Sequence, residues 1–528
     1  MQFPLAHWWT RDTALHSFVF CNFLIGLPFT IFNTYVIYQL QIVGYLIGTD
    51  VDDQPCTTYC IVPWAGSRLD LNSVLLYLNA IGFGVGGAVT MFLSAYSDFW
   101  PRKHLLVTIF IVAFGAFAIP AYWLQGYSVQ NFQTLTALYI IFAIITSILI
   151  ALLNIYIPHC MRTSVSAARE STGGAGRVEE MQHTELKSSL RRYGFNMTIF
   201  GTIAAQVGGV VLLVIVIILS ETLNGTAAAS AGLLVTTVTG FLTVAGSLVA
   251  LCGLPPIPSK PSSPTRNWIE PIVEFFRPFR DLFVRRNMAV LLISYTIYTD
   301  TIFAVTSVIG QLFVAEIRPG ALEYSLYSLA QVLCIIVTNL LFLWIRPKLP
   351  ISLEKWLISG YAISLLLPIW GCIGFAGVSF GFKMRWEFYV QLFVIQLSSS
   401  LANASFRVMF SEMIPVGNEV RWFGLQLTVS CGTIWVNYVA SGPLQNATHE
   451  LRFPLLLALL FLLVSVGMEI CRSTLPVFKN DRRKWEAVEN FTSQGSDDKY
   501  GTDEAVVQKT TVEANVQVGV IVESLIVV

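Results

Sequence analysis

Long apolar runs, each about the length of a membrane-spanning helix, alternate with short polar segments along most of the chain. The first set lies at about 16–42, 72–96, 105–125, 133–157, 195–219 and 229–252. The second set lies at about 288–314, 322–345, 354–378, 387–411, 421–443 and 452–475. A helix crosses a bilayer with about 20 apolar residues, and an open strand cannot satisfy its backbone in lipid. The pattern therefore predicts an all-α integral membrane protein with twelve transmembrane helices in two six-helix halves.

The polar segments between the runs predict the domain organisation. We expect an N-terminal half at 1–253, a cytosolic linker at 254–287, a C-terminal half at 288–475 and a disordered cytosolic tail at 476–528. The linker opens with Pro and Ser residues and continues with aromatic residues at helical spacing among four arginines. That pattern is typical of an amphipathic helix on the membrane surface, and a binding segment for a protein partner is the alternative.

Composition and charge agree with a membrane protein. Apolar residues make up 55% of the 528 residues and charged residues 12%, whereas a soluble domain carries about 25% charged residues. The 32 basic and 32 acidic residues cancel, so nothing indicates a nucleic-acid partner. With a cytosolic N-terminus, 24 basic residues fall on the cytosolic side and five on the other. This excess predicts cytosolic N- and C-termini.

Two cysteines and two sequons lie in the loops predicted to face the lumen. Cys56 and Cys60 stand close together in the sequence CTTYC, where an oxidising lumen allows a disulfide. No second Cys/His pair lies near them, so a zinc site is not expected. The sequons at Asn224 and Asn446 are candidate glycosylation sites in short loops.

No motif predicts an enzyme or an ATP-driven pump. The sequence contains no P-loop or HExxH pattern. Residues 82–87 fit G-x-G-x-x-G, but they lie inside an apolar run without a preceding strand, so close helix packing is the expected role. We expect no cofactor and no metal. The expected partners are a small-molecule substrate, a proton as the coupling ion in one alternative, and the lipid bilayer around a monomer.

The layout of two six-helix sets joined by a long basic loop resembles the major facilitator superfamily, in which two halves rock around a midplane site. The loop after the second run resembles that superfamily's G-x-L-A-D-R-x-G-R-K motif in Asp98, Arg102 and Lys103. An acid at a helix end can hold basic groups and a neighbouring helix N-terminus. These residues are therefore predicted to form a cytosolic gate, with an ordinary helix-end charge as the alternative.

Polar side chains inside apolar runs are the candidate substrate or coupling residues, because charge within a membrane is costly. They are Asp300, Arg407, Tyr298, Asn154 and Gln206. For Asp300, a proton- or cation-coupling role and a structural hydrogen bond are both open. Arg407 either snorkels to the cytosolic interface or binds a substrate carboxylate.

Several stretches are similar to the autophagy-related protein 22 family of fungi, a vacuolar branch of the superfamily. They are the loop from Cys56 to Ser73, the segment Asp98…Arg102-Lys103, Tyr298-Thr299-Asp300, Trp386-Glu387-Phe388-Tyr389 and a helix-10 end motif with Glu412, Pro415 and Glu419. The resemblance implies a multi-pass vacuole-membrane protein that exports leucine and other apolar amino acids to the cytosol after autophagic breakdown, by alternating access.

Charge alone suggests how a zwitterionic substrate is held: Arg407 takes the carboxylate and Asp300 the ammonium group. Two other functions remain open at this point. One is a proton-coupled exporter of another small organic molecule at the plasma membrane. The other is a membrane receptor or scaffold that transports nothing.

Overall fold

The computed structural model describes most of the chain between the first apolar run and the end of the twelfth. The described residues are 13–50, 54–56, 60–97, 100, 102–154, 156–157, 181–223, 230–254, 276, 279–280, 282–414, 419–448 and 450–478. The chain forms two units, residues 1–474 and 475–528. The fold below is that of the first unit, since only 475–478 of the second are described. Most of the predicted amphipathic segment of the linker lies outside the described residues.

Long helices of the described N-terminal half lie where the first six apolar runs predict them. They are α2 (Thr13–Ile47), α3 (Leu71–Ser97), α4 (Lys103–Ala118) with the 3-10 turn η1 (Ile119–Leu124), α5 (Val129–Asn154), α7 (Met181–Thr222) and α9 (Ala231–Gly253). The largest difference is that α7 begins at Met181 rather than near 195. The added residues are polar, but Glu, Lys, Leu and Arg among them favour helix, which a search for apolar runs does not detect.

The second six apolar runs also coincide with helices. They are α11 (Arg286–Leu312) with the π-helical turn η2 (Phe313–Ile317), α12 (Ala321–Ile345) with η3 (Arg346–Lys348), α13 (Leu353–Ser364), α14 (Leu366–Ile373) with η4 (Gly374–Ala376), α15 (Arg385–Met413), α16 (Glu419–Thr448) and α17 (Phe453–Thr474). The ninth run, predicted as one helix, is split into α13 and α14. Pro368 explains the interruption, because a proline ring clashes with the carbonyl four residues earlier, here that of Ser364.

The structure confirms an all-α membrane protein. Ten helical stretches of the described residues are long and apolar enough to cross a membrane. The helices α15 and α16 are as long, with 29 and 30 residues, but are not among the ten. Polar residues are more frequent along these two helices, and the total of twelve spanning helices stays a prediction.

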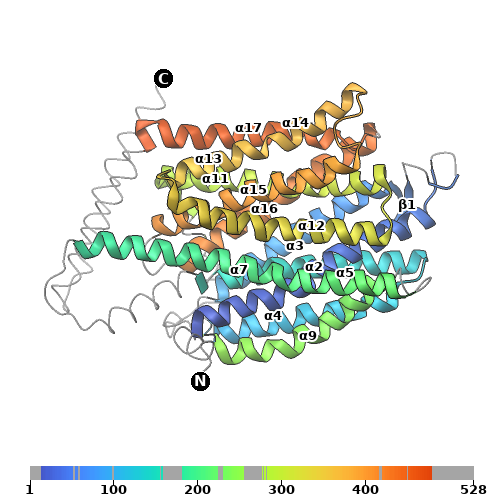
Figure 1. The fold of residues 1–528 in the computed structure, drawn as a ribbon, viewed down its shortest axis with the longest axis horizontal. Coiled ribbons are helices and arrows are strands. Elements are labelled where there is room, and N and C mark those ends of the chain that lie inside the picture. The colour runs from blue at the N-terminus through green and yellow to red at the C-terminus, as the bar shows by residue number, and fades with distance from the viewer. Residues whose placement is uncertain are drawn as a thin grey trace. The chain divides into compact units, whose positions relative to one another are not determined.

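Buried apolar side chains form two main cores, one for each half. The first core draws its residues from 18–254 and only Val332 from beyond them. The second draws its residues from 282–462. The halves meet where α3 packs along α16 and α7 along α12, and in Figure 1 α7 and α12 run side by side. Each half therefore buries most of its own apolar surface and touches the other mainly along these two helix pairs.

Glycines permit close approach of helices within the N-terminal half. The predicted packing role of residues 82–87 is confirmed: a Cβ added to Gly82 would lie 2.7 Å from the Cβ of Ala143 on α5. One turn later, a Cβ on Gly86 would lie 2.9 Å from Ser147 Oγ. Larger residues at these positions would push α3 away from α5.

A short antiparallel hairpin connects α2 and α3. Its strands are β1 (Ile61–Trp64) and β2 (Ser67–Asp70), with Ile61 opposite Asp70. The Asp70 carboxylate then accepts a 2.9 Å hydrogen bond from the backbone N–H of Ser73 in the first turn of α3, which satisfies one of the free N–H groups there.

The hairpin marks one end of the helices, at the right in Figure 1. We call it the hairpin end and the opposite one the linker end, where the chain enters and leaves the segment between α9 and α11. A disulfide joins Cys56 and Cys60 just before β1. In the orientation predicted from charge, the hairpin end faces the lumen.

Candidate functional site

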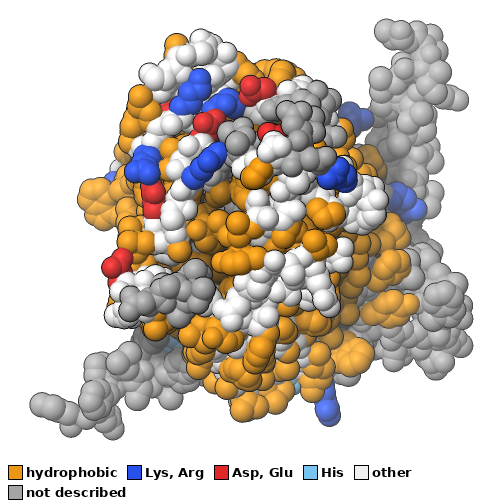
Figure 2. Space-filling view, turned by 90° about the vertical axis from the view of Figure 1, so that its right-hand side faces the viewer, with side chains coloured by type: hydrophobic (Ala, Val, Ile, Leu, Met, Phe, Trp, Pro, Cys, Tyr) orange, Lys and Arg blue, Asp and Glu red, His pale blue; other side chains and the backbone are white. Residues whose placement is uncertain are grey.

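Polar contacts between the two halves gather toward the hairpin end. The hydroxyl of Tyr35 on α2 lies 2.6 Å from Ser325 Oγ on α12. One turn further along α2, the ring of Tyr38 stacks on Tyr324 with centroids 4.6 Å apart. Figure 2 faces this end: hydrophobic side chains lie across the middle and lower part, and most of the charged ones gather over the upper part. These contacts hold α2 against the start of α12.

The helix α3 makes a second set of contacts with the C-terminal half. Ser73 Oγ donates to the carbonyl of Gly442 on α16 at 3.2 Å. Asn79 donates to Ser307 Oγ on α11 at 3.4 Å and accepts a 2.6 Å hydrogen bond from Tyr139 of α5. These hydrogen bonds between the halves lie in the part of the helices nearer the hairpin.

Asp300 lies near the middle of α11 and faces α16. Its side chain is buried, with 3% of its surface exposed. Thr433 Oγ1 lies 2.5 Å from one carboxylate oxygen and Ser430 Oγ 3.4 Å from the other. No described basic side chain lies within ion-pair distance of Asp300. The partners of this carboxyl are therefore two hydroxyl groups of a neighbouring helix.

Two tyrosines of α11 form hydrogen bonds with polar side chains of α15. The hydroxyl of Tyr298 lies 2.8 Å from Ser398 Oγ, and that of Tyr295 donates to Asn403 Oδ1 at 3.0 Å. The ring of Tyr295 also stacks on Phe406, with centroids 3.5 Å apart. These contacts place an aromatic and polar surface between α11 and α15.

Arg407 follows Phe406 and lies six residues before the end of α15 at Met413. Its side chain is partly buried, and no described acidic side chain or carbonyl oxygen lies within reach of its guanidinium group. The hydroxyl of Tyr295 lies within electrostatic range of both Arg407 and Asp300. The structure thus brings three of the predicted residues, Asp300, Tyr298 and Arg407, around Tyr295.

The other two substrate candidates do not join this cluster. Asn154 is the last residue of α5, and Gln206 lies on α7. Both are partly buried, and no described contact links either of them to Asp300 or Arg407. Their part in binding stays a prediction.

Several predicted site residues lie wholly or partly outside the described structure. Asp98, Pro415 and Asn224 are not described, and for Glu419 and Asn446 only the backbone is. Of the gate motif, Arg102 precedes α4 and Lys103 is its buried first residue. Glu412 is partly buried near the end of α15. The gate, the helix-10 end motif and the glycosylation sites therefore stay predictions.

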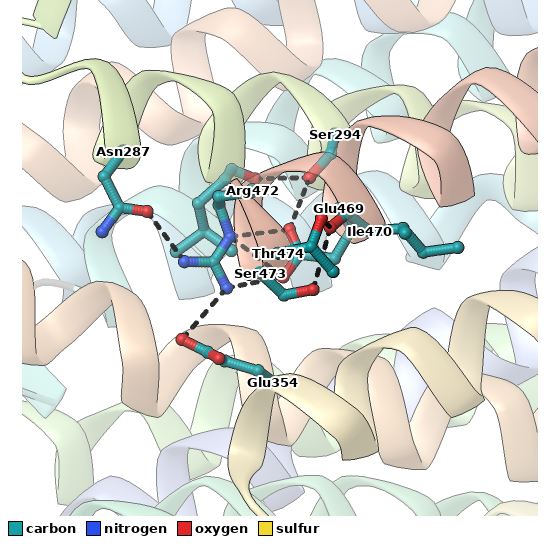
Figure 3. A network of polar contacts seen from close by, with 9 residues as sticks. Asn287, Ser294, Glu354, Glu469, Ile470, Arg472, Ser473 and Thr474 are labelled. Carbon is teal, nitrogen blue, oxygen red and sulfur yellow. Dashed lines mark hydrogen bonds and ion pairs between the residues drawn. The ribbon is translucent and has the colours of Figure 1, made fainter. Parts of the chain in front are cut away.

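A buried ion pair in the last helix is a feature that sequence reasoning missed. Figure 3 shows Arg472 of α17 enclosed by Glu469, Glu354 and Asn287. Its guanidinium donates to Glu469 at 2.6–3.0 Å and to Asn287 Oδ1 at 2.9 Å, and lies 3.7 Å from Glu354. Glu469 also accepts a 3.4 Å hydrogen bond from Ser294. An acid within an apolar run, three residues before an arginine, is the signal that could have revealed this pair.

A second missed carboxylate organises the loop before α15. Both oxygens of Glu387, which is fully buried, accept hydrogen bonds: one from Trp370 Nε1 and the N–H of Gly381, the other from the N–H groups of Lys383 and Met384, all at 2.7–2.8 Å. Family resemblance marked this residue without suggesting its role. The structure assigns it to building the loop rather than to a site.

Comparison with known proteins identifies the family. The family model described as "Vacuole effluxer Atg22 like" matches residues 14–516. The chain belongs to this Atg22-like family. It is 25% identical over 467 residues to Autophagy-related protein 22 of Candida albicans, covering 87% of this chain and 89% of that protein. The Saccharomyces cerevisiae protein of the same name is 23% identical over 204 residues, or 38% of each chain.

Solved structures show the fold. The nucleoside transporter NupG aligns with a TM-score of 0.51 at 11% identity, covering 87% of this chain and 99% of its own. The Escherichia coli fucose:proton symporter FucP aligns with a TM-score of 0.51 at 14% identity, covering 88% and 100%. The xylose transporter XylE aligns with a TM-score of 0.52 at 10% identity, covering 88% and 98%. These likenesses show that this Atg22-like chain has the transporter fold of the major facilitator superfamily.

Proposed function

We propose that this protein exports amino acids, leucine and other apolar ones included, from the vacuole lumen to the cytosol by alternating access. The family description names a vacuole effluxer, and the most extensive similarity reported above is to an autophagy-related protein. Two cores that meet along α3–α16 and α7–α12 suit two halves that rock against each other.

The observation that carries the substrate class is the guanidinium of Arg407, which makes no ion pair with a described residue. A charged side chain within a membrane is costly without a partner, and the described residues supply none. A substrate carboxylate can receive two parallel hydrogen bonds from a guanidinium. Beside it, the stacked rings of Tyr295 and Phe406 offer an apolar surface for the substrate's side chain. An apolar amino acid combines these two features.

Ligand-induced thermal stabilisation of the purified protein across an amino-acid panel tests this proposal. Leucine is expected to raise the melting temperature, and its amide, which lacks the carboxylate, is not. The variant Arg407→Ala should lose the stabilisation, and Arg407→Lys should keep part of it, because a lysine retains the charge but not the bidentate geometry. Arg385→Ala is the matched control, since Arg385 lies on the same helix in an exposed pair with Glu323.

If no amino acid in the panel raises the melting temperature, amino acids are not the substrate class. Equal stabilisation of wild type and Arg407→Ala would leave the class in place and remove Arg407 from the binding site. The proposed location is tested separately: a fluorescently tagged chain is expected at the vacuole membrane, and labelling at the plasma membrane would favour the alternative exporter.

A further inference from the structure

Asp300 has a bonding pattern that suits a proton better than a substrate ammonium group. We propose that Asp300 is a proton-binding site, protonated in this conformation, and that its proton bridges α11 to Thr433 of α16. The proposal rests on the proposed transport function for its coupling role, and it replaces the ammonium role suggested by charge alone.

Asp300 has no countercharge among the described residues. Asp300 is 3% exposed, and no described Lys, Arg or His lies within ion-pair distance of its carboxyl group. Burying an ionised carboxylate without a partner is far more costly than burying the neutral acid, so such a group takes up a proton instead. Two hydroxyl groups are weak compensation for a full charge.

The hydroxyl group of Thr433 has two close oxygen neighbours but only one hydrogen to donate. Its Oγ1 lies 2.8 Å from the carbonyl oxygen of Val429 and 2.5 Å from Asp300 Oδ2. A hydroxyl group has one hydrogen to donate and two lone pairs to accept with. If that hydrogen goes to Val429, as threonine hydroxyls commonly do within helices, the contact with Asp300 needs a hydrogen from the carboxylic acid. The protonated acid satisfies both contacts at once.

The charged and titratable groups around Asp300 do not alter this conclusion. Tyr438 faces it from α16 and Tyr295 from its own helix, each within electrostatic range. Both are neutral hydroxyl groups near pH 7. Arg407 of α15 is a cation that interacts with Tyr295, and it makes no described ion pair with Asp300.

The proton site faces α16, which packs against α3 of the other half. The residues of α16 next to Thr433 face α3: Trp435 lies against Gly84, and the ring of Tyr438 stacks on Phe83 with centroids 6.2 Å apart. Loss of the proton would leave a buried charge between α11 and α16, and water or a cation would have to reach it. Proton release is thereby coupled to separation of α16 from α11. Because α16 also packs on α3, proton release is coupled to the contact between the two halves.

Infrared difference spectroscopy tests the protonation directly and without any substrate. Wild type at pH 7 is expected to show the carbonyl-stretch band of a buried protonated carboxylic acid, and Asp300→Asn is expected to lack it. Thr433→Val removes the hydroxyl and should shift the band, whereas Thr433→Ser should keep its position. Glu450→Gln is the control at an exposed carboxylate and should leave the band unchanged.

Transport in proteoliposomes tests the coupling. Asn resembles the protonated acid and cannot release a proton, so Asp300→Asn should retain amino-acid exchange and lose accumulation driven by a pH gradient, together with substrate-linked proton movement. A pH-driven accumulation equal to wild type in Asp300→Asn overturns the coupling role.

The two proposals fail in different ways. If the carboxylic-acid band of wild type is also present in the spectrum of Asp300→Asn, Asp300 is not protonated, whatever the transport assay shows. Absence of amino-acid exchange by wild type, with the band present, instead refutes the proposed substrate and supports the proton site alone. If Asp300→Asn does not fold, the band shift expected in Thr433→Val decides the question.

Discussion

The ion pair between Glu469 and Arg472 allows a strong prediction about stability. Both side chains are almost completely buried, at 0% and 1% exposed. Arg472 connects three helices, because it lies on α17 and contacts Asn287 of α11 and Glu354 of α13. We predict that Arg472→Met destabilises the C-terminal half strongly.

The expected magnitude follows from what the substitution leaves behind. Methionine removes the guanidinium and its four hydrogen bonds at 2.6–3.0 Å to Glu469 and Asn287. Of the described hydrogen bonds to Glu469, the 3.4 Å contact from Ser294 then remains. Removal of one partner from a buried ion pair costs about 3–5 kcal/mol of unfolding free energy, because the remaining charge is uncompensated.

The double variant Arg472→Met/Glu469→Leu separates this cost from simple loss of packing. Replacement of both partners by apolar residues of similar volume is often nearly neutral, so the double variant should recover all but about 1–2 kcal/mol of the loss. The matched control is Arg385→Met, whose pair with Glu323 is exposed at 67% and 26%. An exposed pair contributes about 0–1 kcal/mol.

Equilibrium unfolding in mixed micelles, followed by circular dichroism, measures these differences. The reasoning requires that the double variant be more stable than Arg472→Met. If the double variant is less stable than the single one, or if Arg472→Met and Arg385→Met lose similar amounts, the buried pair does not carry the energy assigned to it.

Two further predictions concern packing and loop structure. Gly26→Ala should lower the melting temperature and the yield of folded protein, because a Cβ there would overlap the backbone of Ala205 on α7. The control Gly467→Ala has open space around it and should be neutral or slightly stabilising. Equal melting temperatures of the two variants would contradict the close approach of α2 and α7. Glu387→Gln should lower the free energy of unfolding by about 1.5–3 kcal/mol, because an amide cannot replace a carboxylate that accepts hydrogen bonds from four N–H groups. An unfolding curve equal to that of wild type would show that the loop is held by other contacts.

The helices were predictable because each one is nearly self-contained in sequence. A long apolar run reports a spanning helix without reference to any other segment, since every backbone group is satisfied within that helix. The prediction failed where local signals changed: polar helix formers extend α7 back to Met181, and Pro368 divides the ninth run. Both signals were present in the sequence, but neither is an apolar run.

Only the charged residues of the candidate site, whose burial in a membrane is most costly, could be predicted from the sequence. Asp300 and Arg407 were chosen because charge inside an apolar run is rare. Thr433 and Ser430 were not, since hydroxyl residues are common in such runs and only the packing of α16 on α11 gives them a role. Tyr295 was missed for the same reason.

The sequence by itself determined that this chain is a helical membrane protein, how its helices lie along the chain and which family it resembles. Those properties depend on composition and on local periodicity. Only the tertiary structure decided which polar residues meet, because partners such as Asp300 and Thr433, or Glu354 and Arg472, are more than a hundred residues apart. Their pairing depends on helix packing, and helix packing depends on the shapes of many side chains at once.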